Sequence, residues 1–326
     1  MCHGDDRLRL LRRDHRCGGP VVGEVNRTGW PQDATRRRDH LQFENAIAPM
    51  TPALLSGGTV EVVVVAHDSG DLLAEAVASA AEQAGAGNVW VVDAGSSDGS
   101  IEALERRVPG THILRGANDG FAAGNNRGIG ATRSAFVLLL NPDAVLLPSA
   151  LEALLETAAA RPSAAIVAPL ILSFDGGVQA NSFGRFPTLR TAFALRSWRA
   201  FQRTLGNRAL SPAAPRGTTA ADWVTGAAML VRRAAIDAVG GLDEGFFLYY
   251  EDVEWCHRMR DAGWEVLVEP RARVAHRLGG SATPGGAAEQ AYRASFFRYC
   301  DLYGLWALKA VACLAVASRR LGGGRA

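Results

Sequence analysis

The chain has 326 residues, a formal net charge of +2 and 48% apolar residues. This apolar fraction excludes a wholly disordered chain, and a charge balance so close to neutral gives no support for nucleic-acid binding. Lys309 is the only lysine and lies in an apolar run near the C-terminus, which excludes a phosphate loop with a lysine after a glycine-rich turn.

The five cysteines favour a reducing compartment. Their number is odd and no pair has C-x-x-C spacing, so we expect neither a zinc site nor a disulfide framework. The N-terminus has no apolar core of the kind that a signal peptide needs. No apolar run reaches the roughly 20 residues that span a bilayer. These features predict a cytoplasmic protein.

The predicted elements begin after an irregular N-terminal stretch. Residues 1–57 mix arginine, acidic residues, glycine and proline without a sustained period, which predicts a disordered extension. Val60 then opens a continuous β-branched run, as a strand buried on both faces requires. The following pattern predicts strands at 60–65, 89–92, 113–114 and 136–140, and helices at 71–84, 101–107, 124–132 and 151–160. Ser149 and Glu152 form a predicted capping box for the last helix. Alternating strands and helices predict an α/β fold with a parallel sheet covered on both faces.

The second half is less regular and ends in a helical tail. The sequence predicts short strands at 166–167, 170–172, 266–268 and 273–275, and helices at 232–239 and 252–262. The tail covers 286–326, and its stretch 305–317 is apolar apart from Lys309. Such a stretch fits a helix in peripheral contact with a membrane, and it equally fits a helix docked on the domain or on a second subunit. The oligomeric state stays open.

Acidic residues follow three predicted strands. Asp68, Asp93 and Asp143 each lie at a strand end, where an open parallel sheet binds its ligands and a carboxylate can contact a ribose hydroxyl or a metal. Turn formation by aspartate is the alternative explanation. The segment 66–70 after the first strand lacks G-x-G-x-x-G, which disfavours a dinucleotide-binding dehydrogenase.

The densest group of carboxylates lies in 241–252, among large apolar and aromatic residues. Such surroundings raise a carboxyl pKa, which suits a general base at the head of a helix. Asp252 is the candidate, although capping of its helix would explain it equally well. His276 follows a short strand and is either a structural residue or a metal ligand.

Four motifs in this order carry a family resemblance. They are Val-Val-Asp-Ala-Gly-Ser-Ser-Asp-Gly-Ser at 91–100, Gly-Phe-Ala-Ala-Gly-Asn-Asn-Arg-Gly at 120–128, Asn-Pro-Asp at 141–143 and Phe-Phe-Leu-Tyr-Tyr-Glu-Asp-Val-Glu at 246–254. Together they resemble family 2 glycosyltransferases, and most of all the bacterial rhamnosyltransferase branch. The resemblance implies a GT-A fold over 58–285, in which a mostly parallel nucleotide-sugar half (58–160) is fused to an acceptor half (161–285).

The resemblance also implies a role for individual residues. The implied nucleotide-sugar contacts are Ala66, His67, Asp68, Asp93, Asn118, Gly124, Asn125, Asn126 and Asn141. The implied ligands of a divalent metal, Mg²⁺ or Mn²⁺, are Asp143 and His276, with Asn141 standing where the motif usually has its first acid. Trp223 and Gly226 match the acceptor side. Asp252 matches the catalytic base, with Glu251 beside it.

The expected function is therefore an inverting transfer of a sugar from a nucleotide donor. The branch implies L-rhamnose from dTDP-rhamnose, a saccharide or polyprenyl-linked acceptor, and a role in cell-surface polysaccharide synthesis at the cytoplasmic side of the membrane. The alternatives are a UDP-hexose donor or a non-catalytic nucleotide-sugar-binding relative. A nucleotidyltransferase would carry a glycine-rich loop with Lys or Arg straight after the first strand, and 66–70 is not such a loop.

Overall fold

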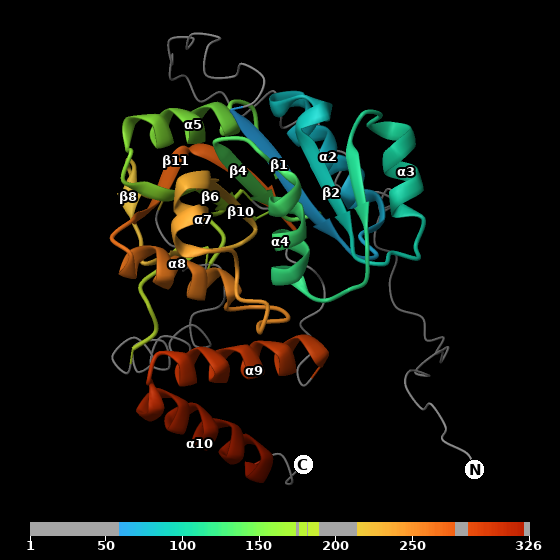
Figure 1. Ribbon diagram of the computed structural model, residues 1–326. Coiled ribbons are helices and arrows are strands. Elements are labelled where there is room, and N and C mark those ends of the chain that lie inside the picture. The colour runs from blue at the N-terminus through green and yellow to red at the C-terminus, as the bar shows by residue number, and fades with distance from the viewer. Residues whose placement is uncertain (1–58, 174–175, 181, 189–213, 278–285, 323–326) are drawn as a thin grey trace, which may run out of the picture. The chain divides into compact units, whose positions relative to one another are not determined.

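The computed structural model describes residues 59–173, 176–180, 182–188, 214–277 and 286–322 (Figure 1). Contacts divide the chain into two units, and all described residues belong to the second unit, Met50–Ala326. The predictions made for 1–57 lie outside the described residues.

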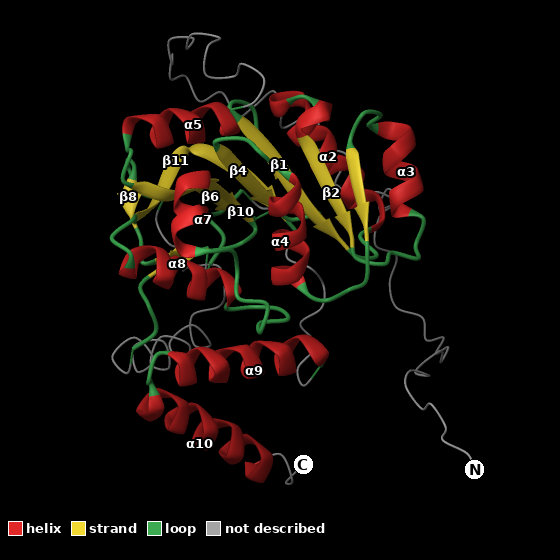
Figure 2. Cartoon of the chain, viewed as in Figure 1, coloured by secondary structure: helices red, strands yellow, loops and turns green. Residues whose placement is uncertain are grey.

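The first half alternates strands and helices, as the sequence predicts (Figure 2). Its elements are β1 (Val60–Ala66), α2 (Gly70–Ala84), the 3₁₀ helix η3 (Ala86–Asn88), β2 (Val89–Asp93), α3 (Ser100–Arg107), β3 (His112–Arg115), α4 (Phe121–Ala131), β4 (Phe136–Leu140), β5 (Ala144–Leu146) and α5 (Ala150–Ala160). The second half contains β6 (Ala164–Leu172), β7 (Phe183–Gly184), β8 (Thr219–Ala220), β9 (Trp223–Val224), β10 (Ala228–Arg232), α7 (Arg233–Val239), α8 (Glu251–Asp261), β11 (Glu265–His276), α9 (Ala287–Leu302) and α10 (Trp306–Gly322).

One mixed sheet forms the centre of the domain. Its order is β3-β2-β1-β4-β10-β6-β11-β5, and β8 pairs with β11 outside this path. The strands β1 to β4 pair in parallel, as predicted. The second half adds antiparallel pairings, since β10 runs antiparallel to both β4 and β6. Directly before β10 the chain passes through β9, which pairs with β7 in a separate two-stranded sheet.

Both faces of the sheet are buried, as the continuous valine run predicts. In β1, Val62 and Val64 pack into one core together with residues of α2, α3 and α5. Val63, between them, packs into a second core with residues of α4, α7 and α8. Alternate side chains of one strand thus enter opposite layers, which explains why no polar alternation is visible in its sequence.

Several predicted boundaries differ from the structure. Each predicted pair of short strands in the second half is one long strand, β6 or β11, and β11 continues past its proline with a register shift between Glu269 and Arg273. The capping box at α5 is wrong, because Ser149 has a left-handed φ of 61° and makes no side-chain cap bond. Gln83 serves the start of this helix instead, since its Oε1 accepts a 3.0 Å hydrogen bond from the N–H of Leu151.

The helical tail consists of two helices separated by a turn at Gly304, whose φ is 64°. α9 packs on the domain through the buried Tyr299, which shares a cluster with Phe246 and Val253. Within the described residues, no helix combines the length and the apolar character that a bilayer crossing requires.

Candidate functional site

The ends of β1 and β2 bring together the first group of predicted nucleotide-binding residues. In the parallel pairing, Ala66 lies opposite Asp93. The Nδ1 atom of His67 lies 2.9 Å from the carbonyl oxygen of the residue after Asp93. Asp68 has a left-handed φ of 46°, and its Oδ1 accepts a 2.7 Å hydrogen bond from the N–H of Ser97. The loops after the two strands are therefore bonded to one another at the carboxyl edge of the sheet, where such sheets bind ligands.

Asp98 is a residue of this edge that the sequence analysis did not single out. Its carboxylate accepts hydrogen bonds from the N–H of Gly70 at 2.7 Å and from the N–H of Ser100 at 3.0 Å. Burial acts to raise the pKa of Asp98, but the hydrogen bonds from Ser100 and Gly70 outweigh it and lower the pKa. An ionised Asp98 ties the first turn of α2 to that of α3. The Asp-Gly-Ser turn ahead of a helix was the available signal.

α4 lies close against β1 because of a glycine. A Cβ atom at Gly124 would come within 2.7 Å of a methyl group of Val65. The loop ahead of the helix is shaped by Asn118, whose Oδ1 accepts a 3.3 Å hydrogen bond from the N–H of Gly120. The structure thus places Gly124 and Asn118 around the end of β1. Their predicted contact with a nucleotide-sugar stays a prediction.

The two asparagines of α4 have protein partners for their side-chain amides. Asn125 is buried and donates a 2.9 Å hydrogen bond to the carbonyl oxygen of Phe121 in its own helix. Asn126 reaches across to the segment ahead of α8, where it accepts from the N–H of Leu242 and donates to Leu242 O and Glu244 Oε1, each at 2.9 Å. Asn126 therefore joins α4 to the segment between α7 and α8. A direct nucleotide-sugar contact of either side chain stays a prediction.

The predicted metal residues do come together. Asn141 and Asp143 follow β4, and His276 is the last residue of β11, opposite Ala144 in the antiparallel β5–β11 pairing. The Nε2 atom of His276 lies 3.2 Å from Asp143 Oδ1 and 3.3 Å from Asn141 Nδ2. Residues 135 positions apart in the chain thus meet at one point.

This cluster presents a set of donors that fits a divalent cation. Gln179 Oε1 lies 2.9 Å from His276 Nδ1, and Gln179 Nε2 donates to His276 O, so the ring is fixed with Nε2 towards Asp143. The Oδ1 atom of Asn141 is buried and has no hydrogen-bond partner. One carboxylate, one orphaned amide oxygen and one imidazole nitrogen suit Mg²⁺ or Mn²⁺. Among the residues that the structure describes, no three or more His, Cys, Asp or Glu side chains are placed to hold a metal ion. Only Asp143 and His276 of this cluster are of these types, and Asn141 stands where a further acid would complete the group.

The candidate base lies at the first turn of α8, after a strained segment. Tyr249 and Tyr250 both have left-handed φ values, 69° and 67°, which are rare for bulky residues and occur at sites that the fold holds in place. The two carboxylate oxygens of Asp252 each accept a 2.8 Å hydrogen bond, Oδ1 from the N–H of Val253 and Oδ2 from the N–H of Gly226. Asp252 is therefore held in one orientation from both sides.

Burial perturbs both carboxyl groups of this turn. It raises the pKa of Asp252, and the two accepted hydrogen bonds only partly oppose it. Burial also raises the pKa of Glu251, and the charge of Asp252 adds to this effect. Because Asp252 accepts two backbone hydrogen bonds and Glu251 Oε2 has no hydrogen-bond partner, we expect Glu251 to hold the proton and Asp252 to carry the charge. The positive end of the α8 dipole favours that charge.

Backbone contacts link the candidate base to the metal cluster. Gly226, which binds Asp252, is followed by Ala227, whose carbonyl oxygen accepts a 2.9 Å hydrogen bond from the N–H of Asn141. Asp143 lies two residues further along the chain. The neighbouring strands β4 and β10 thus bring the candidate base and the predicted metal ligands to the same edge of the sheet.

Trp223 and Gly226 lie beside this link, on the predicted acceptor side. The ring N–H of Trp223 donates a 2.9 Å hydrogen bond to the carbonyl oxygen of Arg185. A Cβ at Gly184 would come within 3.3 Å of the Trp223 ring, and one at Gly226 within 3.1 Å of the Phe121 ring. The acceptor side is therefore closely packed around two glycines, and its contact with an acceptor stays a prediction.

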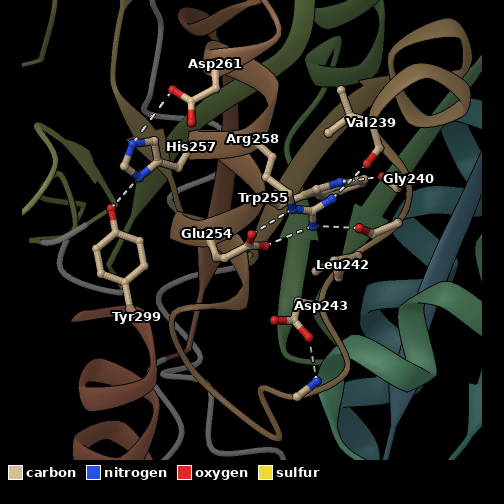
Figure 3. Close-up of polar contacts among 12 residues, drawn as sticks. Val239, Gly240, Leu242, Asp243, Glu254, Trp255, His257, Arg258, Asp261 and Tyr299 are labelled. Carbon is tan, nitrogen blue, oxygen red and sulfur yellow. Dashed lines mark hydrogen bonds and ion pairs between the residues drawn. The ribbon is translucent and has the colours of Figure 1, made fainter. Parts of the chain in front are cut away.

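Arg258 anchors the segment that precedes the base (Figure 3). Its guanidinium donates hydrogen bonds to the carbonyl oxygens of Val239 at 3.0 Å and Gly241 at 2.7 Å, and it pairs with Glu254 at 2.7 Å. The ring N–H of Trp255 donates a 2.8 Å hydrogen bond to the carbonyl oxygen of Gly240. The end of α7 is thus fixed to α8.

α9 holds the same segment from the other side. Arg298 donates to both carboxylate oxygens of Asp243, at 3.1 and 2.7 Å, and Ser295 Oγ donates a 2.8 Å hydrogen bond to the carbonyl oxygen of Leu248. Burial acts to raise the pKa of Asp243, but the hydrogen bonds from Arg298 and Gly245 outweigh it and lower the pKa. The chain between Asp243 and the base is therefore held by an ion pair with α9.

His257 attaches α9 to the base helix itself. Its Nδ1 atom lies 2.8 Å from the hydroxyl oxygen of Tyr299. Figure 3 shows the two side chains pointing towards one another. The ring of His257 stacks between Phe186 and Tyr303 at centroid distances of 4.2 and 3.8 Å. Burial lowers the pKa of His257 against the opposing charge of Asp261, which favours the neutral ring in this aromatic stack.

Comparison with known proteins gives consistent matches. A family model described as glycosyl transferase family 2 matches residues 61–220. The N-acetylglucosaminyl-diphospho-decaprenol L-rhamnosyltransferase of Mycobacterium tuberculosis is 30% identical over 247 residues, which cover 67% of this chain and 76% of that protein. The rhamnosyltransferase WbbL of Escherichia coli is 22% identical over 183 residues, or 54% of this chain and 67% of that protein.

A solved structure has the same fold. The crystal structure of GalNAc-T7 with UDP, GalNAc and Mn²⁺ superposes with a TM-score of 0.54 at 14% identity, over 76% of this chain. The matched region is 48% of that structure, so this chain spans about half its length. The expected GT-A architecture is confirmed.

Proposed function

The chain belongs to glycosyl transferase family 2 and is a glycosyltransferase, and from this premise we propose that it moves L-rhamnose from dTDP-rhamnose to a saccharide or lipid-linked acceptor. Two matched relatives, from Mycobacterium tuberculosis and Escherichia coli, carry rhamnosyl transfer in their names, and the first acts on a decaprenol-linked acceptor. Cell-surface polysaccharide synthesis at the cytoplasmic face of the membrane is the role that this pair of substrates supports.

A single observation carries the mechanism. The carboxylate of Asp252 binds the N–H of Gly226, and the next carbonyl, that of Ala227, binds the N–H of Asn141. A base that faces an incoming hydroxyl and a cluster that faces a leaving diphosphate therefore share one edge of the sheet. One displacement between them inverts the anomeric carbon and needs no protein nucleophile.

Asp252 performs the proton transfer in this proposal. Its raised pKa makes it a stronger base than an exposed aspartate while it stays ionised beside a neutral Glu251. The two backbone donors, at Gly226 and Val253, keep one carboxylate geometry before and during the reaction. The base takes the proton of the acceptor hydroxyl as that oxygen bonds to the sugar carbon, which releases the nucleoside diphosphate.

Asn141, Asp143 and His276 would hold the divalent cation. A bound Mg²⁺ or Mn²⁺ neutralises charge that collects on the leaving diphosphate. Gln179 fixes the ring of His276 with Nε2 towards Asp143, and the unpartnered amide oxygen of Asn141 would supply an oxygen ligand. The loops after β1 and β2 would bind the base and ribose through His67, Asp68 and Asp93.

A donor panel tests the proposal. The full chain is melted with dTDP-rhamnose, UDP-glucose and UDP-N-acetylglucosamine, each with Mn²⁺ or with EDTA. A ligand at a hundredfold excess over its Kd stabilises by about 2.7 kcal/mol, so dTDP-rhamnose should give the largest rise in Tm, and only with Mn²⁺. Transfer to N-acetylglucosaminyl-diphospho-polyprenol is followed by mass spectrometry, and the anomeric configuration of the product by NMR.

Each of these measurements can contradict a different part of the proposed function. The largest shift and transfer with a UDP-hexose would replace the donor. Retention at the anomeric carbon would exclude the single displacement. Full binding with EDTA would remove the metal from donor recognition.

A further inference from the structure

In the part of α10 whose side chains the structure describes, residues 306–314, one side packs on α9. Leu308 is buried, and Lys309 Nζ donates to both carboxylate oxygens of Asp301 at 2.6 and 2.7 Å. The same ammonium group lies 5.7 Å from the centre of the Phe297 ring. Positions 308 and 309 therefore face the rest of the domain.

The other side of α10 is apolar and exposed. Trp306 is 65% and Leu314 71% exposed, and Ala307, Ala310 and Val311 between them are exposed too. Positions 306, 307, 310, 311 and 314 recur at helical spacing, so these side chains form one continuous stripe, which we call the outer stripe. Few large apolar side chains of a globular protein stay so exposed, and a continuous patch of them marks an interaction surface.

The charges of α10 indicate which surface would cover the outer stripe. The helix contains no acidic residue, and its sequence adds Arg319 and Arg320 to Lys309. An apolar face, a tryptophan at one end and arginines at the other are the features of a helix that lies in the headgroup region of a membrane. Arginine side chains are attracted by anionic lipid headgroups.

We propose that the outer stripe of α10 docks this protein on the surface of an anionic phospholipid bilayer. The helix lies in the plane of the interface, because no described helix is long and apolar enough to cross. A second copy of the chain is a weaker candidate. One face of a 17-residue helix offers far less than the roughly 1,200 Å² of buried area that a stable protein interface needs, and the basic residues of two copies would repel.

The contacts of α9 connect this surface to the candidate base. α9 carries Phe297 and Asp301, which bind α10, and also Arg298 and Ser295, which bind Asp243 and the carbonyl oxygen of Leu248. For the proposed function, docking would thus hold the acceptor side of the site near the bilayer in which a lipid-linked acceptor resides. The docking itself does not depend on that function.

Vesicle flotation of the full chain tests the docking. The protein is floated with vesicles of phosphatidylglycerol and phosphatidylcholine in equal parts, and with phosphatidylcholine alone. We expect flotation with the anionic vesicles, weakened by salt. The double variant Trp306→Ser with Leu314→Ser should bind the vesicles at least about tenfold more weakly, because two large apolar side chains no longer insert between the lipids. The pair Arg319→Gln with Arg320→Gln should lose about tenfold or more on anionic vesicles alone, since each charge near the surface contributes about 1 kcal/mol.

Matched controls remove similar groups elsewhere. Phe247 is 54% exposed but lies outside α10, and Phe247→Ser should float like the wild type. Arg106→Gln with Arg107→Gln removes the same two charges from the exposed end of α3 and should also leave binding unchanged. Circular dichroism and Tm establish that every variant is folded.

Several outcomes would overturn the proposal. A wild-type protein that stays out of the anionic vesicle fraction would exclude lipid docking. Equal flotation of the outer-stripe double variant and the wild type would assign binding to another surface. A dimer in sedimentation that dissociates on Trp306→Ser, without vesicle binding, would identify a second copy as the occupant. Because flotation needs no turnover, an inactive but floating protein would contradict the proposed function and leave the docking intact.

Discussion

Replacement of Asp252 by asparagine tests whether this side chain acts as the catalytic base or only stabilises the structure. The carboxylate accepts two backbone hydrogen bonds at 2.8 Å, from Gly226 and Val253. An asparagine keeps only one acceptor oxygen, so one backbone N–H would face an NH₂ group and lose its partner. Leaving one such group unsatisfied costs about 1–3 kcal/mol in stability. The chemical step would lose general base catalysis, which contributes roughly 10²–10⁴-fold, or about 2.7–5.4 kcal/mol in the barrier.

The assay measures turnover and donor binding on the same preparation. We expect kcat of Asp252→Asn to fall by about 10²–10⁴-fold, while calorimetry gives an unchanged Kd for the nucleotide-sugar. Glu251→Gln is the matched control, one residue earlier on the same turn of α8. Because we expect Glu251 to be protonated already, its neutral isostere should keep kcat within about tenfold. Wild-type turnover in Asp252→Asn, or equal losses in the two variants, would refute the assignment of the base.

The two carboxyl groups also predict how stability depends on pH. Burial raises the pKa of Glu251 above its ordinary 4.5 and that of Asp252 above 3.8, so the folded protein binds protons that the unfolded chain has lost. The free energy of unfolding should therefore fall as pH rises from these ordinary values to the raised ones, by up to about 1.4 kcal/mol per pH unit and proton. Glu251→Gln should flatten this decline, and denaturant unfolding at several pH values measures it. A steeper decline in the variant would contradict the sign.

Three further predictions concern the surroundings of the site. His276→Ala should weaken Mn²⁺-dependent donor binding by about tenfold or more, measured by calorimetry with and without the ion, and an unchanged metal effect would contradict the cluster. Arg298→Ala removes both hydrogen bonds to Asp243 and should lower kcat more than donor affinity, with partial recovery in Arg298→Lys; a loss of stability alone would make the ion pair merely structural. Gly124→Ala should destabilise the fold by about 1–3 kcal/mol, because the new Cβ would meet a side chain of β1. The control Gly130→Ala lies in the same helix with open space around it and should stabilise the fold by up to about 1 kcal/mol. Equal effects of the two variants in urea unfolding would refute the packing argument.

The sequence predicted the parts of this fold that local pattern determines. The valine run of β1 and the apolar run of β4 identify strands buried on both faces, and both are strands of the central sheet. The acidic residues at strand ends were found for the same reason, since a short polar residue after a buried strand is visible without knowledge of the fold. The structure places Asp93 at the end of β2, Asp68 in the loop after β1 and Asp143 in the turn after β4.

The residues that the sequence did not reveal act over long distances along the chain. Gln179 binds a histidine 97 positions away, and Arg298 binds an aspartate 55 positions away. A glutamine or an arginine in a polar stretch carries no local mark of its partner, because only the closed fold brings the two together. At Ser149 the sequence contains a capping motif that the fold does not use. Ser149 has a left-handed backbone and makes no side-chain cap bond, and Gln83 from another helix bonds to the start of α5 instead.

The antiparallel insertion of β10 explains why the site could be listed from motifs and not assembled from them. In a wholly parallel sheet, the segment before a strand lies at the amino edge, so Gly226 and Ala227 would sit away from the carboxyl end of β4. Because β10 runs antiparallel to β4, Ala228 pairs with Leu140, and the segment before β10 lies beside the segment after β4. The reversal of this one strand places the partner of the base next to the Asn-Pro-Asp turn. The direction of a strand is decided by its neighbours, so the arrangement of the site is a property of the sheet and not of any motif.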